Sequence, residues 1–557
     1  MQSVKNYIFL LLGILLMAMP NAWAQRNDSL IKDNQIEVIK NFKPVLSEAI
    51  KIPVNPNPEK PEYVKPLFSY SLPNAQYHVQ PTIYTIKPLS LGTMLLPKLR
   101  GNYIKIGYGN FNMPLFEGYL NTTRNKNYQA GLFVKHLSGN GDENYNNFSN
   151  NTAYGYVKKF TAKGVLGADA YYHRNRVNLY GAPNDALTLS KDPKFIYQLV
   201  DIKTNYQNYS KDSAGLLYKV DLNYYNFNNL EGFKENDFAL KGRISKQNTD
   251  IPFELVTGLR FNNNMIKNTV GDYYNYQRIY FDLNPQLFMN SENFYLKAGF
   301  NSTINSDSTN STFHFYPKAE GAYHIIKNKF TVYGGLTGWL DPITYRSVWT
   351  ENPFVNQITL RNTSHNLEAY FGFKGELGQQ TSFLISFNAA KIENLTFYST
   401  DSATAEQILV YDTGKSRLST ISIGLQHQWN EKFRMGIIAN ILNYKLTNVA
   451  QPYTRPQFET KLNSTYNISD KFLLKFDIIY WGLRYGRLDA KRTDGSLVST
   501  DFKMNPFVDL NFGIDYRYNK KLSAFIQFNN IANNRYQRFY NYPVYGINIM
   551  GGLTFTF

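Results

Sequence analysis

Apolar and polar residues alternate with a period of two along most of the chain from Gly101 onward. Successive side chains of a β-strand point to opposite faces, so this period predicts strands with one apolar and one polar face. Clear examples lie at residues 214–224, 364–377, 420–429 and 545–557. In the last of these, one face carries Tyr545, Ile547, Ile549, Leu553, Phe555 and Phe557, and the other carries Asn548, Thr554 and Thr556.

Short turn signals and longer polar segments divide this pattern in alternation. The short signals lie at residues 125–127, 162–164, 211–213, 248–250, 291–293, 327–329, 378–380, 430–432, 469–471 and 519–521. The longer segments lie at residues 139–147, 181–192, 341–362, 400–415, 489–500 and 533–542. Two strands for each of the ten short turns, with one more strand at each end, give about 22 strands.

Two all-β architectures fit this alternation. A soluble β-sandwich or β-helix would turn its apolar faces inward, whereas a membrane barrel would turn them toward lipid. Three features favour the membrane barrel: the final alternating strand ends at Phe557, aromatic residues such as Tyr276, Tyr480 and Trp481 lie near strand ends, and no strand is apolar on both faces. We therefore predict a transmembrane antiparallel β-barrel over residues 98–557, with short periplasmic turns and long extracellular loops.

One stretch breaks the alternation. Between Lys471 and Arg487 the apolar set includes Phe476 and Tyr480 and then shifts by one residue to Trp481. Either a β-bulge lies near Tyr480, or the strand leaves the membrane at that point.

The N-terminus predicts export. Lys5 precedes an apolar run from Tyr7 to Met19, and Ala22-Trp23-Ala24 is a cleavage site of the small-x-small type. We interpret residues 1–24 as a cleaved secretory signal peptide, with an uncleaved anchor helix as the alternative. The chain has no cysteine, which excludes a lipid anchor at the new N-terminus and a disulfide scaffold. These features predict the outer membrane of a Gram-negative cell.

Residues 25–97 have a different composition. The stretch Ile52 to Pro61 contains four prolines, which cannot continue a helix or a central strand, so this part is an extended linker. We expect the segment to lie in the periplasm or to fill the barrel. Ahead of it lies a short β-prone run that could add as a strand to a periplasmic partner or pack on the barrel: Gln35, Ile36, Glu37, Val38 and Ile39.

The composition adds a basic charge but no catalytic motif. The formal net charge is +17. Such a charge could attract anionic solutes or lipopolysaccharide phosphates, or it could belong to a basic surface that is simply solvated. We favour the solvated surface. An exported chain excludes nucleic acid as a partner. The seven histidines show no metal-ligand spacing, and neither a nucleophile elbow nor a Walker loop occurs, so we expect no metal, no cofactor and no enzyme activity.

Charged residues on the polar faces of the predicted strands are candidates for the barrel interior. Both signs occur among them, so they could form a network that fills or stiffens the lumen. They are Lys219, Asp221, Glu368, Lys374, Glu376, Lys475 and Asp477.

Three stretches resemble a known family. The end of the chain, from Phe528-Asn529-Asn530-Ile531 to Phe557, is similar to the end of a TonB-dependent receptor barrel. Residues 42–52 and 103–111 resemble a group of TonB-dependent-receptor-like outer-membrane proteins of Bacteroidota. The resemblance implies a barrel of 22 strands, inserted by the barrel-assembly machinery, for which the apolar face ending at Phe557 is the candidate signal. The family also carries a globular plug domain, for which residues 25–97 are too few and too rich in proline.

Three functions follow from these expectations. The first is a transport channel, for uptake or export, closed by its own N-terminal segment or by a partner. The second is a structural or assembly platform for a partner protein. The third is an energy-coupled receptor, with Gln35–Ile39 as the segment that contacts the coupling protein.

Overall fold

The computed structural model describes residues 101–557, except residue 124 and residues 142–145, 182–193, 210–214, 230–231, 248, 250, 268–272, 308–309, 328, 492–493 and 495. The expected signal peptide, the proline-rich segment and the run Gln35–Ile39 lie outside the described residues.

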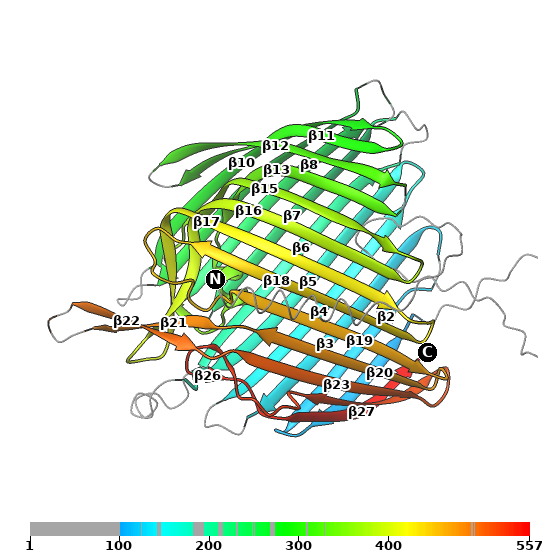
Figure 1. The fold of residues 1–557 in the computed structure, drawn as a ribbon, viewed down its shortest axis with the longest axis vertical. Helices are drawn as coiled ribbons and strands as arrows, with labels where there is room; N and C mark the ends of the chain where they lie inside the picture. The colour runs from blue at the N-terminus through cyan, green and yellow to red at the C-terminus, as the bar shows by residue number, and fades with distance from the viewer. Residues whose placement is uncertain are drawn as a thin grey trace, which may run out of the picture. The chain divides into compact units, whose positions relative to one another are not determined.

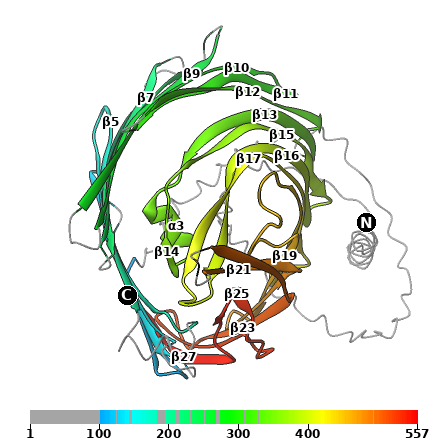
Figure 2. The same ribbon diagram turned by 90° about the vertical axis from the view of Figure 1, so that its left-hand side faces the viewer.

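Within the described part of the chain, 22 antiparallel strands close into a single barrel (Figures 1 and 2). Each barrel strand pairs with the next one along the chain, and the last strand, β27, pairs with β1 through contacts such as Lys105↔Thr554. The fold class and the number of strands predicted from the sequence are confirmed. The barrel strands are β1 (Tyr103–Gly109), β2 (Met113–Asn121), β3 (Tyr128–Asn140), β4 (Asn147–Phe160), β5 (Gly164–Asn178), β6 (Lys194–Asn208), β7 (Leu217–Asn229), β8 (Phe233–Lys246), β9 (Phe253–Lys267), β10 (Tyr273–Asn290), β11 (Phe294–Asp307), β12 (Ser311–Ile326), β13 (Phe330–Pro342), β15 (Asn362–Leu377), β16 (Thr381–Asp401), β17 (Gln407–Gln428), β18 (Phe433–Lys445), β19 (Phe458–Ile468), β20 (Phe472–Trp481), β23 (Phe507–Arg517), β24 (Leu522–Asn529) and β27 (Asn548–Thr556).

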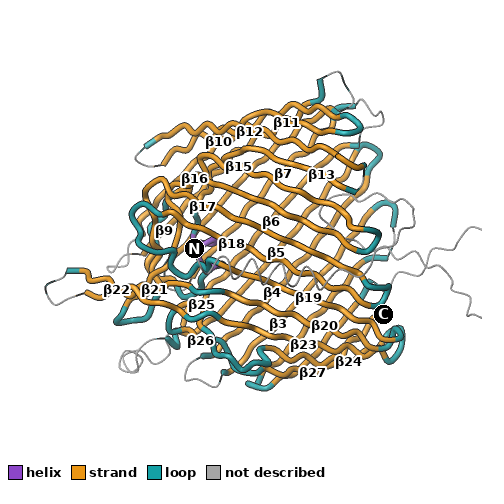
Figure 3. Tube along the Cα trace, in the orientation of Figure 1, coloured by secondary structure: helices purple, strands orange, loops and turns teal. Residues whose placement is uncertain are grey.

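The two ends of the barrel differ in their connections. All ten short turn signals fall between successive barrel strands, at the end where β1 begins and β27 ends. The opposite end carries the longest connections, which Figure 3 shows as the larger loops. We call these the short-turn end and the long-loop end. This asymmetry is typical of outer-membrane barrels.

The outer face of the barrel is apolar and the inner face is polar. Phe387 on β16 and its pairing partner Ile421 on β17 are 48% and 40% exposed, whereas their neighbours Ser386 and Ser422 lie on the opposite face. The buried polar residues include Glu235 on β8, Asn262 on β9 and Arg278 on β10, all on the inner face. An apolar exterior around a polar interior is the arrangement that lipid requires.

Two expected loops differ from the prediction. Residues 400–415 are mostly strand, because β16 continues to Asp401 and β17 begins at Gln407. Residues 341–362 are not a polar loop: Val348, Trp349 and Val355 in this segment are almost completely buried.

Two aromatic residues also lie elsewhere than expected. The hydroxyl of Tyr276 donates to Asp307 at 3.1 Å, and the Arg278 guanidinium lies over its ring, so Tyr276 faces the interior instead of the membrane boundary. Tyr545 precedes β27 and packs against Phe111 and Phe148 instead of extending the outer face of the last strand.

The break in alternation near Tyr480 marks the end of a barrel strand. β20 ends at Trp481, and its next neighbour in the barrel is β23. Between them, β21 (Arg484–Lys491) and β22 (Leu497–Met504) form a hairpin that projects from the long-loop end (Figure 1), and β21 also pairs in parallel with the end of β16. The pairings of β20 with β19 and β23 show no register shift, so no β-bulge lies at Tyr480, and the barrel strand ends where the alternation breaks.

Four further elements come from the long-loop end. Figure 2 shows α3 (Tyr345–Glu351) and β14 (Val355–Gln357) inside the ring of barrel strands, with β25 (Gln537–Phe539) nearby. β25 pairs with β26 (Tyr542–Pro543), and β14 pairs in parallel with the start of β17. Among the described residues, no helix has both the length and the apolar character needed to cross a membrane.

An arginine on the outer face should destabilise the barrel much more than an arginine on the inner face. We expect Ile421→Arg to lower the free energy of unfolding by about 2 kcal/mol, because the guanidinium would enter lipid. The adjacent Ser422→Arg is the matched control and should change the free energy little. Urea unfolding in lipid vesicles measures both variants, and equal effects would contradict the assignment of the faces.

Candidate functional site

The helix α3 begins at a local capping motif. Thr344 is the N-cap: its side-chain oxygen accepts the backbone N–H of Ser347 at 3.1 Å, and the Ser347 hydroxyl accepts the backbone N–H of Thr344 at 2.9 Å. These two bonds satisfy donors that have no partner within the helix. A helix this short gains little stability by itself, so its position depends on packing against the wall.

One side of α3 packs against the inner wall of the barrel. The Trp349 ring stacks on Phe227 of β7 at 5.3 Å between centroids and meets Phe233 of β8 edge-on at 5.1 Å. Tyr345, one turn earlier, joins the same cluster together with Leu199 of β6. The Trp349 indole N–H donates to the Val355 carbonyl at 2.7 Å, which ties the helix to β14.

Two buried charges of the wall hold the start of the helix. The Glu235 carboxylate accepts the backbone N–H of Tyr345 at 2.7 Å and the Tyr225 hydroxyl at 2.5 Å. The Arg278 guanidinium donates to the Ile343 carbonyl at 2.9 Å. Burial and the nearby Glu235 raise the pKa of the Tyr345 phenol. Both wall residues are at most 1% exposed, so the contacts form in a site from which water is excluded.

A third contact joins the first turn of the helix to β6. Arg346 donates to Asp201 at 2.9 Å, and its guanidinium lies 4.6 Å from the centre of the Tyr225 ring. Asp201 also accepts from the Asn223 amide at 2.6 Å and pairs with Lys203 at 3.6 Å. Asp201 is therefore shared between the wall and the helix.

Loops that are distant in sequence meet on the other side of the helix. Phe354 stacks on Tyr542 at 3.7 Å, and the Tyr542 hydroxyl donates to the Ala405 carbonyl at 3.1 Å. The Tyr180 hydroxyl donates to the Pro543 carbonyl at 3.0 Å. Burial raises the pKa of the Tyr542 phenol well above its usual value. Four connections of the long-loop end thus share one aromatic cluster.

The end of α3 is held by an ion pair with another loop. Glu351 pairs with Arg455 and accepts the Tyr398 hydroxyl at 2.9 Å. Burial lowers the pKa of Arg455, but the Glu351 carboxylate together with the nearby Tyr398 and Tyr444 outweighs that effect, and the pKa is raised. Residues 343–361, which we call the inner loop, are therefore attached to the wall and to neighbouring loops along their whole length.

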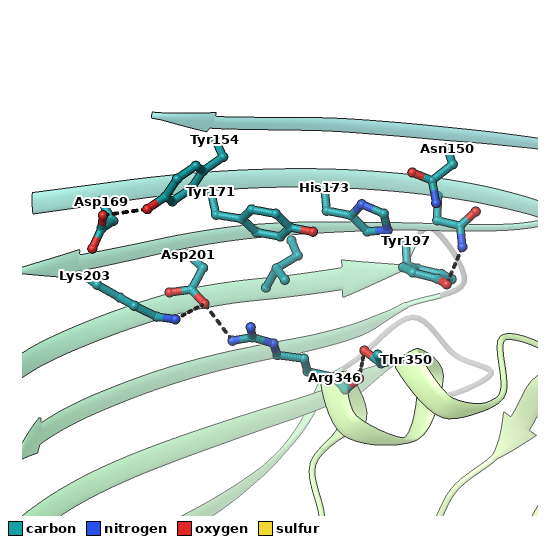
Figure 4. Close-up of a pocket in the computed structure, with 12 residues that line it drawn as sticks. Asn150, Tyr154, Asp169, Tyr171, His173, Tyr197, Asp201, Lys203, Arg346 and Thr350 are labelled. Carbon is teal, nitrogen blue, oxygen red and sulfur yellow. Dashed lines mark hydrogen bonds and ion pairs between the residues drawn. The ribbon is translucent and has the colours of Figure 1, made fainter. Parts of the chain in front are cut away.

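A cavity of about 650 Å³ lies between the inner loop and the wall (Figure 4). Its wall side is formed by the inner faces of β4, β5 and β6, and its other side by Arg346 and Thr350 of α3. Tyr154, Tyr171 and His173 line the wall side. Among the described residues, no group of three metal-ligating side chains comes together.

The charged residues proposed for the interior lie in separate places. Lys219 and Asp221 form an ion pair of 2.7 Å on β7, and Lys475 of β20 pairs with Asp515 of β23 at 2.7 Å. Glu368 of β15 accepts the Asn388 amide and lies 3.6 Å from His365. Lys374 lies over the Tyr333 ring, whereas Glu376 and Asp477 lie further along β15 and β20. They are distributed around the wall and do not form one site.

The residues of the proposed barrel-assembly signal lie at the end of the chain. Ile549, Leu553, Phe555 and Phe557 are between 41% and 57% exposed, and Ile547, just before β27, is 36% exposed. Their exposure leaves the apolar face of the last strand open to the surroundings.

Sequence reasoning missed the inner loop and the cavity. The signal for the inner loop is its apolar content, because a solvent-exposed loop has no reason to carry Ile343, Val348, Trp349 and Val355. The signal for the cavity is weaker: tyrosine, histidine and aspartate recur at every second position of β5, where the inner face of a strand would place them. Neither pattern shows which strands the inner loop contacts or which strands complete the cavity beside β5.

Comparison with known proteins finds similarity in structure but not in sequence. No protein-family model matches the chain, and no curated protein matches it. The chain is similar to the ferripyoverdine receptor of the outer membrane of Pseudomonas aeruginosa, with a TM-score of 0.64 and 12% identity over 83% of this chain and 72% of that one. It is also similar to the FrpB iron transporter of Neisseria meningitidis, with a TM-score of 0.66 and 9% identity over 83% and 82%. The ferric-catecholate import receptor Fiu of E. coli gives a TM-score of 0.60 at 12% identity over 83% and 82%. At these identities the likeness establishes a shared barrel fold.

Removing the Glu235 carboxylate should loosen the inner loop while the barrel stays closed. In Glu235→Ala the Tyr345 N–H and the Tyr225 hydroxyl lose a charged acceptor, a change that costs about 1–3 kcal/mol. We expect amide hydrogen exchange in residues 343–361 to become at least ten-fold faster.

Glu320→Ala is the matched control. Glu320 also accepts tyrosine hydroxyls inside the barrel, from Tyr295 at 2.8 Å and Tyr370 at 3.3 Å, but on strands that do not hold the helix. Its removal should leave exchange in the inner loop unchanged. Equal exchange in the two variants would show that Glu235 does not anchor the helix.

Proposed function

We propose that the protein is an outer-membrane transport barrel that is closed at rest. The observation that carries the proposal is the inner loop, which lies inside the ring of strands and is bound to the wall through Glu235, Arg278 and Asp201. A barrel of this size leaves a wide interior, and an open interior would admit solutes without selection. A loop held by buried polar contacts keeps the barrel closed until those contacts are exchanged.

The fold supports transport over the other functions considered. The similar structures are named as receptors or transporters of iron or its complexes, and each shares the barrel with this chain. The proposed location is the outer membrane, where the apolar exterior contacts lipid and lipopolysaccharide.

We propose that the N-terminal segment is a second part of the protein that controls opening of the barrel. Residues 25–97 would act from the periplasm, and Gln35–Ile39 would offer a strand to a periplasmic or energy-coupling protein. Cross-linking from Glu37 in intact cells tests this part: a specific adduct with a periplasmic protein supports it, and no adduct contradicts it. The outcome does not alter the role of the inner loop.

Conductance across a planar lipid bilayer tests the closed barrel. We expect the mature protein to conduct little, and a variant in which a short glycine–serine linker replaces residues 343–361 to conduct at least ten-fold more, because the inner loop no longer obstructs the interior. Deletion of residues 26–97 shows whether the N-terminal segment contributes a separate obstruction.

A β21–β22 hairpin shortened by removal of residues 490–498 serves as the control, because these residues follow the pairing of β21 with β16 at Thr400↔Leu488 and Asp401↔Asp489. Its conductance should equal that of the intact protein. A mature protein that already conducts like an open pore, or one that neither deletion opens, would refute the proposal.

A further inference from the structure

The cavity between α3 and the wall is built on three adjacent strands in register. Successive rows across β4, β5 and β6 hold Asn150–Asn175–Tyr197, then Thr152–His173–Leu199, then Tyr154–Tyr171–Asp201. A fourth row pairs Asp169 with Lys203. Six residues of β5 separate the first row from the last, so the cavity extends about 20 Å along the strand. Its shape is that of a groove for an elongated ligand.

Aromatic rings form a stripe along this groove. Tyr171 and His173 lie nearly parallel, with an angle of 12° and 6.1 Å between centroids, and His173 lies 6.4 Å from Tyr197. At the other end Tyr154 stacks on Tyr156 at 5.9 Å. Figure 4 shows Tyr154, Tyr171 and His173 side by side on one side of the groove. The stripe offers flat apolar surfaces with polar edges.

Several polar groups along the stripe are available to a ligand. The Tyr171 hydroxyl and the Nε2 atom of His173 make no hydrogen bond to other described residues, whereas His173 Nδ1 lies 3.1 Å from the Thr152 hydroxyl. Asp169 accepts the Tyr154 hydroxyl at 2.8 Å on one of its oxygens, which leaves the other oxygen free to accept. Donors and acceptors therefore alternate with the rings.

The fixed charges of the groove are balanced. Asp169 and Asp201 contribute two carboxylates, and Lys203 and Arg346 contribute two cations. A site for phosphate or for a multiply charged chelate needs an excess of one sign. A lipid site needs a mainly aliphatic lining, and Leu199 is the one aliphatic residue among those that line the cavity.

We propose that this groove binds a short, uncharged oligosaccharide. Sugar rings present an apolar face that stacks on tyrosine and histidine, and hydroxyl groups at the ring edge that both donate and accept hydrogen bonds. The cavity volume lies within the range of small-molecule sites. An oligosaccharide would be the substrate of the transport function proposed above. The proposal rests on that function, because transport would carry the bound oligosaccharide through the barrel.

A glycan array tests the proposal with the detergent-purified mature protein. The array carries neutral and acidic oligosaccharides of two to eight units, and we expect binding to neutral members. For the best of these, Tyr171→Ala should raise the Kd about ten-fold by calorimetry, because the ring loses its stacking contact. Tyr171→Phe keeps the ring and should retain most of the affinity, which a merely structural loss would not explain.

Tyr333→Ala is the matched control. Tyr333 is a half-buried tyrosine on the inner face of β13, across from Tyr370 and away from the groove, and its removal should leave the Kd unchanged. No binding to any glycan, binding to acidic glycans alone, or equal losses in the two alanine variants would overturn the proposal. If glycans do not bind but replacing the inner loop still opens the barrel, the substrate class is wrong and the transport function stands.

Discussion

Backbone hydrogen bonding in lipid is the constraint on which the rest of this structure depends. An unsatisfied N–H or C=O in hydrocarbon costs several kcal/mol, so a sheet that crosses a membrane cannot keep a free edge. The pairing of β1 with β27 removes that edge after 22 strands. The number of strands sets the width of the barrel, and the width leaves an interior that the inner-face side chains of the wall do not fill. The inner loop, the buried charges and the cavity all follow from that interior.

Buried charges are acceptable here because each has several partners. Glu235 and Arg278 are held inside the wall, where a carboxylate or a guanidinium without partners would destabilise the fold strongly. The Glu235 carboxylate accepts hydrogen bonds from the first backbone N–H of the helix and from the Tyr225 hydroxyl. The Arg278 guanidinium donates to the Ile343 carbonyl and, at 2.8 Å, to the Asn262 amide oxygen. The wall and the inner loop therefore satisfy each other. Moving the loop leaves buried groups without partners unless water or a ligand replaces them.

The sequence predicts local features of this fold well and distant ones poorly. The period of two and the turn signals are local, so strand number, strand order and the end of β20 at Trp481 follow from residues a few positions apart. The contact between Glu235 and Tyr345 joins positions 110 residues apart, and the alternation in β8 gives no sign of it. The prediction for the inner loop was wrong for a related reason. The length of residues 341–362 fits an extracellular loop, and only Trp349 and its apolar neighbours indicate burial. The groove needs the register of three strands, because Asp169 meets Lys203 only when β5 and β6 are aligned.

The cavity and the closed state share one ion pair, and that ion pair links the two proposals physically. Arg346 and Asp201 both line the groove, and their ion pair holds the first turn of α3 to β6. The Glu235 and Arg278 contacts lie at the start of the helix, and neither residue lines the groove. A ligand in the groove therefore competes for the Arg346 contact and leaves the other two intact. Such a ligand can shift the inner loop only by the difference between its affinities for the attached and the released loop. Complete opening must therefore draw on a second source of free energy that acts on the start of the helix.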